Sequence, residues 1–176
     1  IAGSWRDLGG ADFEIDERSE VHSSEKIISS GEIATDTLQL VGLEAAWVNG
    51  PLSIQSEYMS TDIQAVDSRE DGTFDGYYLQ TSYFLTGESR QYKKGVFRKV
   101  EPMDVSGAWE LSARYSVLNT RESTEGNKGE TSTLGVNYYY DKNLRIMANL
   151  LHSEVEQEVN GEGDGNAISI RLQYDF

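Results

Sequence analysis

The sequence contains no cysteine, only two prolines and two histidines, and no apolar run long enough for a transmembrane helix. The missing cysteine excludes a disulfide framework, a thiolate nucleophile and a cysteine metal site. A membrane-spanning helix needs roughly 18 or more consecutive apolar residues. The lack of such a run still permits a membrane protein that crosses with strands, because alternating strands give only a weak hydropathy signal.

The composition fits a folded β-protein of a single domain. The chain has 176 residues, of which 38% are hydrophobic and 10% aromatic, and disordered chains lack aromatic residues. Its mean hydropathy of −0.53 suits half-polar strands with polar loops, and it suits a soluble acidic β-protein equally well. We therefore expect residues 1–176 to form a single domain, a length at which β-barrels run as one unit.

Negative charge is concentrated in four segments. Residues 16–34, 62–75, 119–131 and 154–164 together carry a net charge of −13 out of the −15 of the whole chain. Such acidic loops stay solvated, and divalent cations can bridge them to anionic lipopolysaccharide. Plain solubility explains them as well. An acidic chain of this kind is not expected to bind nucleic acid.

The last ten residues, 167–176, alternate strictly between two faces. Apolar and aromatic side chains occupy one face, and polar side chains occupy the other. This pattern suits a strand with lipid on one side and water on the other. The apolar face consists of Ile168, Ile170, Leu172, Tyr174 and Phe176, and the polar face of Ser169, Arg171, Gln173 and Asp175.

The same alternation marks eight candidate strands, which predict an all-β, transmembrane, antiparallel up-and-down β-barrel. Residues 1–10 are interpreted as a turn or the tail of a strand. Tight turns are expected at 49–51 and 141–143, long charged loops at 19–34, 64–73, 119–130 and 153–165, and a basic connection at 86–106. The candidate strands are 11–18, 35–48, 52–58, 77–85, 109–117, 134–140, 144–150 and 167–176.

Two groups of side chains on these strands carry functional predictions. Aromatic residues near the strand ends at the tight turns predict a membrane-interface girdle made of Trp47, Tyr83, Tyr138 and Tyr140, followed by Tyr174 and Phe176. Charged residues on the polar faces predict a pore lining made of Glu44, Glu57, Glu110, Arg114, Arg145 and Arg171. Glu110 and Arg114 are interpreted as an ion pair of the lumen wall or as selectivity groups. In a narrow eight-stranded barrel the same charges would instead fill the interior as a polar core.

No residue pattern predicts catalysis, a metal site or a cofactor. His22 and His152 lie in polar surroundings without a nucleophile partner and are interpreted as exposed structural histidines. The run 67–75 superficially resembles a calcium loop, but it lacks the alternating ligands and the terminal glutamate, so a solvated loop is favoured.

Three segments resemble the phosphate-selective porins of the O and P type. They are GLEAAWVNGPLSIQSEYMSTDI (42–63), YYLQTSYFLTGESRQYKKGVF (77–97) and GAWELSARYSVLN (107–119). The resemblance implies a trimeric, 16-stranded, water-filled channel in the bacterial outer membrane, with this chain as its C-terminal half. It also implies that Tyr174 and Phe176 form the signal read by the barrel assembly machinery. The anion-binding constriction of that family comes chiefly from the N-terminal half, so the resemblance assigns no phosphate-site residue here.

Three functions follow from these patterns. The first is a passive porin for small hydrophilic solutes, including anions such as phosphate. The second is a closed eight-stranded barrel acting as a structural or binding module, and the third is an outer-membrane enzyme. Pairing between the last strand, 167–176, and the first, 11–18, would favour the closed barrel, whereas an open edge would favour part of a larger one.

Overall fold

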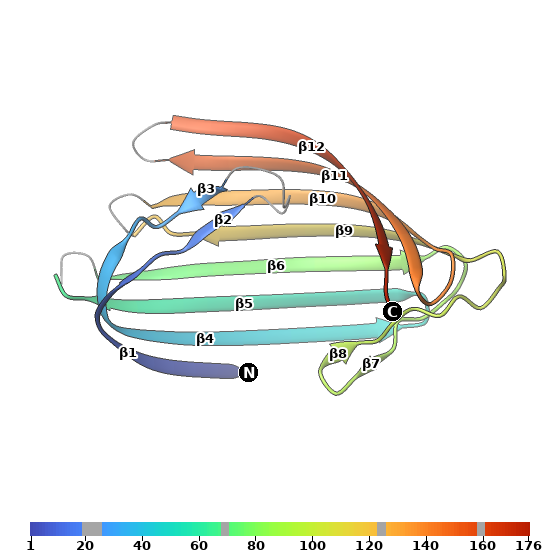
Figure 1. Ribbon diagram of the computed structural model, residues 1–176, viewed down its shortest axis with the longest axis horizontal. Helices are drawn as coiled ribbons and strands as arrows, with labels where there is room; N and C mark the ends of the chain where they lie inside the picture. Colours follow the sequence, from blue (N-terminus) through green and yellow to red (C-terminus); the bar gives the residue numbers. More distant parts are fainter. Residues whose placement is uncertain (19–25, 68–70, 123–125, 158–160) are drawn as a thin grey trace.

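The computed structural model is an eight-stranded antiparallel sheet with two small hairpins (Figure 1). It describes residues 1–18, 26–67, 71–122, 126–157 and 161–176. The strand order of the large sheet is β1-β4-β5-β6-β9-β10-β11-β12, so each strand pairs with the next one of the sheet along the chain. The strands are β1 (Ala2–Phe13), β2 (Asp16–Arg18), β3 (Lys26–Ser29), β4 (Ile33–Asn49), β5 (Leu52–Ala65), β6 (Gly72–Phe84), β7 (Tyr92–Lys93), β8 (Val96–Phe97), β9 (Ala108–Asn119), β10 (Asn127–Tyr139), β11 (Leu144–Gln157) and β12 (Gly161–Tyr174).

The prediction of an all-β, up-and-down antiparallel fold with eight main strands is confirmed. The sheet is not closed, because β1 and β12 are its two edges and no pairing joins them within the described residues. The arrangement is that of part of a barrel. The described residues include no helix that is long and apolar enough to cross a membrane.

The strands are longer at one end than the sequence predicts, so three of the expected long loops are wrong in extent. Residues 153–157 and 161–165 belong to β11 and β12, where they pair across the two strands, and residues 127–133 belong to β10. At this end of the sheet β5, β9 and β11 end at Ala65, Asn119 and Gln157, and β6, β10 and β12 begin at Gly72, Asn127 and Gly161. In these strand ends polar side chains occupy both faces, so the alternation that identifies a half-apolar strand disappears while the backbone pairing continues.

The predicted first strand at 11–18 is also misplaced. β1 begins at Ala2, and its register with β4 shifts between Asp7 and Ala11, where Gly9 and Gly10 have positive φ angles of 59° and 84°. Residues 16–18 form β2 instead, which pairs with β3 in a separate hairpin. The bulge and the glycines interrupt the side-chain alternation of β1, which explains why its first half reads as a turn.

The large sheet has two faces of different chemistry, because side chains alternate along every strand. We call the face that contacts the two hairpins the inner face and the opposite one the outer face. Two small apolar clusters lie on the inner face. One joins Ile33, Ile63, Ala65 and Phe74 with Phe13 and Ile15, and the other joins Phe84, Val100, Ala108 and Tyr139.

Two tight turns lie at one end of the sheet, which we call the short-turn rim. Between β4 and β5, Gly50 has a φ of 55°, which the first position of a type II′ turn requires, and Pro51 follows it. Between β10 and β11, the Asp141 carboxylate accepts hydrogen bonds from the backbone N–H groups of Asn143 and Leu144, at 2.7 and 2.8 Å. These two bonds lower the pKa of Asp141 below its ordinary value. Both turns lie where the sequence predicts them.

Candidate functional site

All six charged residues predicted to line a pore lie on the inner face. The register pairs Glu44 with Glu57, aligns Glu110 with Asn137, and aligns Arg145 with both Tyr139 and Gln173. The acidic pair belongs to β4 and β5, whereas the arginines belong to β9, β11 and β12. The acidic pair and the arginines thus occupy different strands of the same inner face.

The arginine side of the inner face contains a hollow of about 450 Å³, which we call the basic hollow. The Arg145 guanidinium donates two hydrogen bonds to Gln173, at 2.8 and 3.2 Å, whereas Arg171 is exposed. No carboxylate is among the described residues that line the hollow. Its charged lining consists of Arg90, Arg114, Arg145 and Arg171, and its other polar groups are the hydroxyls and amides of Gln80, Ser112, Thr133, Asn137, Asn149 and Ser169.

Arg114 lies between this hollow and the acidic side. Its guanidinium carbon is 3.8 Å from the centre of the Tyr78 ring, which is close enough for a cation–π contact. One guanidinium nitrogen is 3.4 Å from the Gln80 side-chain oxygen. The Tyr78 hydroxyl in turn accepts a hydrogen bond from Gln55 at 2.8 Å. These contacts hold the guanidinium beside Tyr78 and Gln80 of the wall.

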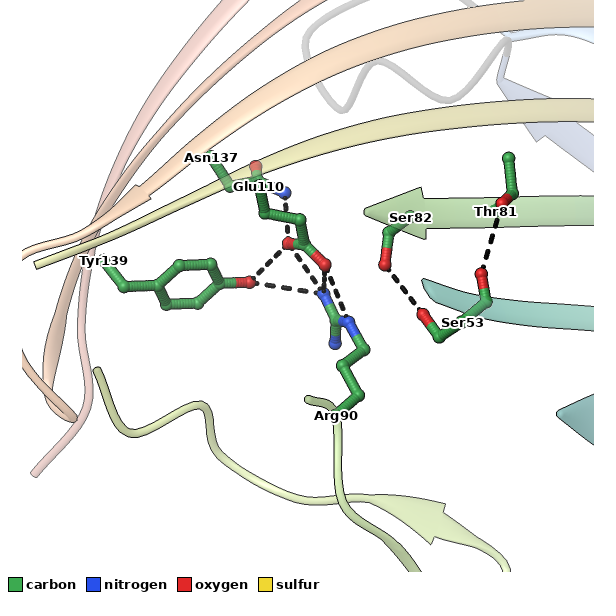
Figure 2. A network of polar contacts seen from close by, with 7 residues as sticks. All are labelled: Ser53, Thr81, Ser82, Arg90, Glu110, Asn137 and Tyr139. Carbon is green, nitrogen blue, oxygen red and sulfur yellow. Dashed lines mark hydrogen bonds and ion pairs between the residues drawn. The ribbon is translucent and has the colours of Figure 1, made fainter. Parts of the chain in front are cut away.

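Glu110 has a different environment from the other five charges, because its side chain is fully buried. Arg90 donates to both carboxylate oxygens, from Nε at 2.8 Å and from a terminal nitrogen at 2.9 Å (Figure 2). Asn137 and the Tyr139 hydroxyl each donate to Oε2 at 2.8 Å. Glu110 therefore forms its ion pair with Arg90, and the pairing with Arg114 that the sequence suggested is replaced by this one.

Arg90 belongs to the connection between β6 and β9, residues 85–107, which folds onto the inner face at the short-turn rim. Val100 of this connection is buried against Phe84 and Tyr139 of the wall. Its hairpin, β7–β8, turns at Lys94 and Gly95, whose φ angles are 56° and 79°. The sequence predicts a long basic connection here, but nothing in the alternation indicates that it folds inward.

The second inward segment is the β2–β3 hairpin, of which the sequence places β2 in the predicted strand 11–18 and β3 in the expected loop 19–34. Ile28 of β3 is 5% exposed and lies against Gly129 of β10. The Ser29 backbone N–H donates to the Asn127 side chain at 3.1 Å, and the Thr120 hydroxyl donates to the Ser29 carbonyl at 2.8 Å. The hairpin thus reaches from the β1–β4 side of the sheet to β10 (Figure 1). Within this segment, the apolar pair at 27–28 among polar residues was the signal that the sequence offered.

The outer face carries the predicted aromatic residues at the short-turn rim. Trp47, Tyr83 and Tyr140 are about half exposed, at 50%, 47% and 58%. Tyr138 is partly covered, since its ring centre is 4.7 Å from that of Trp109 and its hydroxyl donates to the Ser106 carbonyl at 2.9 Å. Aliphatic side chains occupy the outer face between this rim and the polar strand ends, and include Val41, Leu43, Leu79, Leu111, Leu134, Val136, Ile146, Leu150, Ile168, Ile170 and Leu172.

The C-terminus lies at the same rim, beside the first residues of β11 (Figure 1). Tyr174 and Phe176 both belong to the outer face, and their rings meet edge to face with centres 5.2 Å apart. The Asp175 backbone N–H donates to the Asn143 carbonyl at 2.8 Å, which holds the chain end against the 141–143 turn.

The geometry offers no acid–base pair for a nucleophile at the described histidine. His152 Nε2 lies 3.0 Å from Glu154, and Nδ1 lies 3.0 Å from Asn166, on the exposed outer face. No group of three or more potential metal ligands occurs within the described ranges. His22 and part of the run 67–75 lie outside the described residues.

Comparison with known proteins gives one family match and two relatives. The family model described as phosphate-selective porin O and P matches residues 3–176. Porin O of Pseudomonas aeruginosa is 38% identical over 151 residues, which cover 77% of this chain and 34% of that protein. An uncharacterized protein of Caulobacter vibrioides is 31% identical over 113 residues, which cover 60% of this chain and 22% of that protein. The chain thus spans about a third or less of the length of these relatives.

Proposed function

Because this chain belongs to the phosphate-selective porin O and P family, a family of the bacterial outer membrane, we propose that it contributes the C-terminal wall of a passive, water-filled channel. The inner face would line the channel and the outer face would contact lipid. The observation that carries this proposal is the opposite chemistry of the two faces of one sheet. Aliphatic residues cover the outer face, whereas the inner face carries arginines, carboxylates, hydroxyls and amides.

The open edges support a wall that is completed by further strands. β1 and β12 both leave backbone groups unpaired along one side within the described residues, and such groups are too costly to expose to lipid. A larger barrel satisfies them, as the 16-stranded architecture of the resemblance implies. A closed eight-stranded module would require β1 to pair with β12.

The solutes we propose are small anions, including phosphate, which Arg114, Arg145 and Arg171 would attract along the basic hollow. At about 8 Å in water, a single charge changes the energy of a monovalent ion by roughly 0.5 kcal/mol, which is about a twofold change in local concentration. Several arginines on one side of a lumen therefore suffice for a moderate preference. Glu44 on β4 and Glu57 on β5 would repel anions from another part of the same inner face.

We further propose three kinds of contact around the barrel. Trp47, Tyr83, Tyr138 and Tyr140 would lie at the membrane interface, and Tyr174 with Phe176 would be recognised by the barrel assembly machinery. The acidic strand ends opposite the short-turn rim would face lipopolysaccharide. The complete protein would assemble as a homotrimer, as the family resemblance implies.

Planar-bilayer recordings of the full-length protein in a salt gradient test this function. We expect Arg171→Gln, and more strongly Arg145→Gln combined with Arg171→Gln, to lower the anion-to-cation permeability ratio. Glu44→Gln should raise it. Arg121→Gln is the matched control, since it removes the same charge from a residue paired with Glu156 away from the basic hollow.

Two outcomes of these recordings have different meanings. The absence of ion-conducting steps from the folded wild-type protein would refute the channel itself. Normal conductance with a permeability ratio that is the same in all variants would refute only the role of the arginines.

A further inference from the structure

The burial of Glu110 depends on a segment that is not part of the wall. Its neighbours across the sheet are Phe84 on β6 and Asn137 on β10, all three on the inner face. The side that faces away from the wall is covered by Arg90 of the 85–107 connection. Val100 of the same connection is buried against Phe84 and Tyr139 of the wall. Without this connection the carboxylate would face the lumen.

The wall orients this carboxylate for one partner. Asn137 and Tyr139 both donate to Oε2 and hold the carboxylate in place, and Arg90 then reaches both oxygens at once. The Tyr139 hydroxyl also lies 3.2 Å from an Arg90 nitrogen, so one tyrosine contacts both charges (Figure 2). A planar guanidinium that meets a carboxylate with two bonds gives geometric specificity that a lysine could not provide.

The arginine is also held from its other side. Its guanidinium carbon lies 5.9 Å from the ring centre of Phe84 and 5.7 Å from that of Phe97. Phe97 belongs to β8, so the β7–β8 hairpin contributes to the site that holds Arg90. Removal of the ion pair would therefore loosen the hairpin as well as the stretch around Arg90.

A second buried carboxylate stiffens the connection internally. Glu88 is 3% exposed, accepts a hydrogen bond from the Thr86 hydroxyl, and accepts another from the Met103 backbone N–H at 3.1 Å. These bonds close residues 86–103 into a compact unit, but they do not tie that unit to Glu110. Arg90 supplies this link.

From this geometry we infer that Arg90 and Glu110 form a latch that holds the 85–107 connection inside the channel mouth at the short-turn rim. Glu110 is then a positioning residue, and it acts through the connection rather than by contact with the solute. The connection carries four further exposed bases, Lys93, Lys94, Arg98 and Lys99. The latch keeps their charge and the bulk of the hairpin at a fixed place in the mouth. This inference rests on the proposed channel only for its effect on current.

A spin label on the hairpin tests the latch without any transport measurement. The 176-residue chain contains no cysteine, so Lys93→Cys places one label on it, at an exposed position of β7. In the full-length protein in lipid, we expect a largely immobilised spectrum. Glu110→Gln and Arg90→Met should each raise the released, mobile fraction by on the order of a hundredfold, because each breaks a buried, hydrogen-bonded ion pair.

Arg98→Met is the matched control, since it removes the same charge from the same connection without touching Glu110. Arg90→Met changes no residue of the wall, so it remains informative if Glu110→Gln fails to assemble. Arg90→Lys should recover only part of the immobilised fraction, because lysine cannot bond both oxygens in a fork. A merely structural ion pair would weaken folding and leave the label equally immobile in the folded fraction.

Channel recordings of the same variants supply the functional readout. We expect open-channel noise to rise in Glu110→Gln and Arg90→Met, in which the connection is released. It should stay at the wild-type level in Arg98→Met, which removes one charge from the mouth and leaves the latch intact. A label that is equally immobile in all variants would overturn the latch. A wild-type protein that does not conduct, with a label released by Arg90→Met, would refute the proposed function and leave the latch standing.

Discussion

Gly129 is the residue whose substitution tests the inward position of the β2–β3 hairpin. A Cβ atom at this position would lie 2.2 Å from Cδ1 and 2.7 Å from Cγ1 of Ile28. Carbon atoms in contact are ordinarily about 3.5 to 4.0 Å apart, so the two residues must separate by roughly 1.5 Å. Gly129→Ala thus acts on the hairpin through one added methyl group.

The size of the effect follows from what attaches the hairpin. Overpacking of this kind costs about 1 to 3 kcal/mol. Burial of Ile28 contributes roughly 1.5 to 3 kcal/mol, and the two hydrogen bonds at Ser29 contribute about 0.5 to 1.5 kcal/mol each. The methyl group therefore removes a large share of the attachment. Protection of the hairpin amides from hydrogen exchange should therefore decrease by a factor of about 5 to 100.

Hydrogen exchange measured by mass spectrometry on the folded protein gives this quantity. Gly163→Ala is the control, since a Cβ there meets no atom within 4 Å. We expect faster exchange over residues 26–33 in Gly129→Ala, with residues 144–156 unchanged. Equal protection of the hairpin in both variants would refute the inferred packing of Ile28 on β10.

Two further predictions concern the short-turn rim. Gly107 and Gly50 both have positive φ angles, of 81° and 55°, but a Cβ at Gly107 would lie 2.5 Å from the Tyr139 carbonyl oxygen, whereas one at Gly50 meets nothing within 4 Å. Gly107→Ala should therefore lower the free energy of unfolding by about 1 to 3 kcal/mol more than Gly50→Ala does, and its urea midpoint should be the lower of the two. Equal midpoints would contradict the collision. The lowered pKa of Asp141 means that its carboxylate stabilises the 141–143 turn above the ordinary aspartate range and loses this effect as the pH falls through the lowered value. Asp141→Ala should thus unfold at lower urea than the wild type at neutral pH, with a difference that shrinks in strong acid, and a difference independent of pH would contradict this reasoning.

The sequence predicts the part of the fold that has one apolar face. In β12, the alternation from Ile168 to Tyr174 fixes both the strand and the side that faces outward. Beyond Ala167 the same strand continues to Gly161 with small and polar residues, and the sequence predicts a loop. The physical reason is that only the lipid-facing half of a strand requires alternation, whereas backbone pairing requires none.

The inward segments could not be predicted in the same way. Ile28 and Val100 are single buried residues in polar surroundings, and each packs on a strand distant in the sequence. Gly129 offers a retrospective signal, since its missing side chain makes the room that Ile28 occupies. Such a glycine identifies a close approach but not the partner that approaches.

The ion pair between Glu110 and Arg90 also could not be predicted from the alternation of side chains along the strands. Residues four apart on a strand are separated by about 13 Å along the backbone, so Glu110 and Arg114 are poorly placed for a direct pair even though they share a face. Arg90 lies in a connection without alternation, and only the inward fold of that connection brings it to 2.7 Å from the carboxylate. Shared faces are local properties of a strand, whereas this contact depends on tertiary structure.

The distribution of charge on the inner face matters more than its sum. The six predicted residues balance, with three carboxylates and three guanidiniums, but Arg90 already neutralises Glu110. Glu44 on β4 and Arg145 on β11 are five strand spacings apart, which is about 24 Å along the sheet. Exposed charges are largely screened beyond about 8 Å at physiological salt. Carboxylates on β4 and β5 therefore cannot cancel the field of Arg145 and Arg171. In the proposed channel, an anion near β11 and β12 would thus experience a positive wall even though the sequence count is neutral.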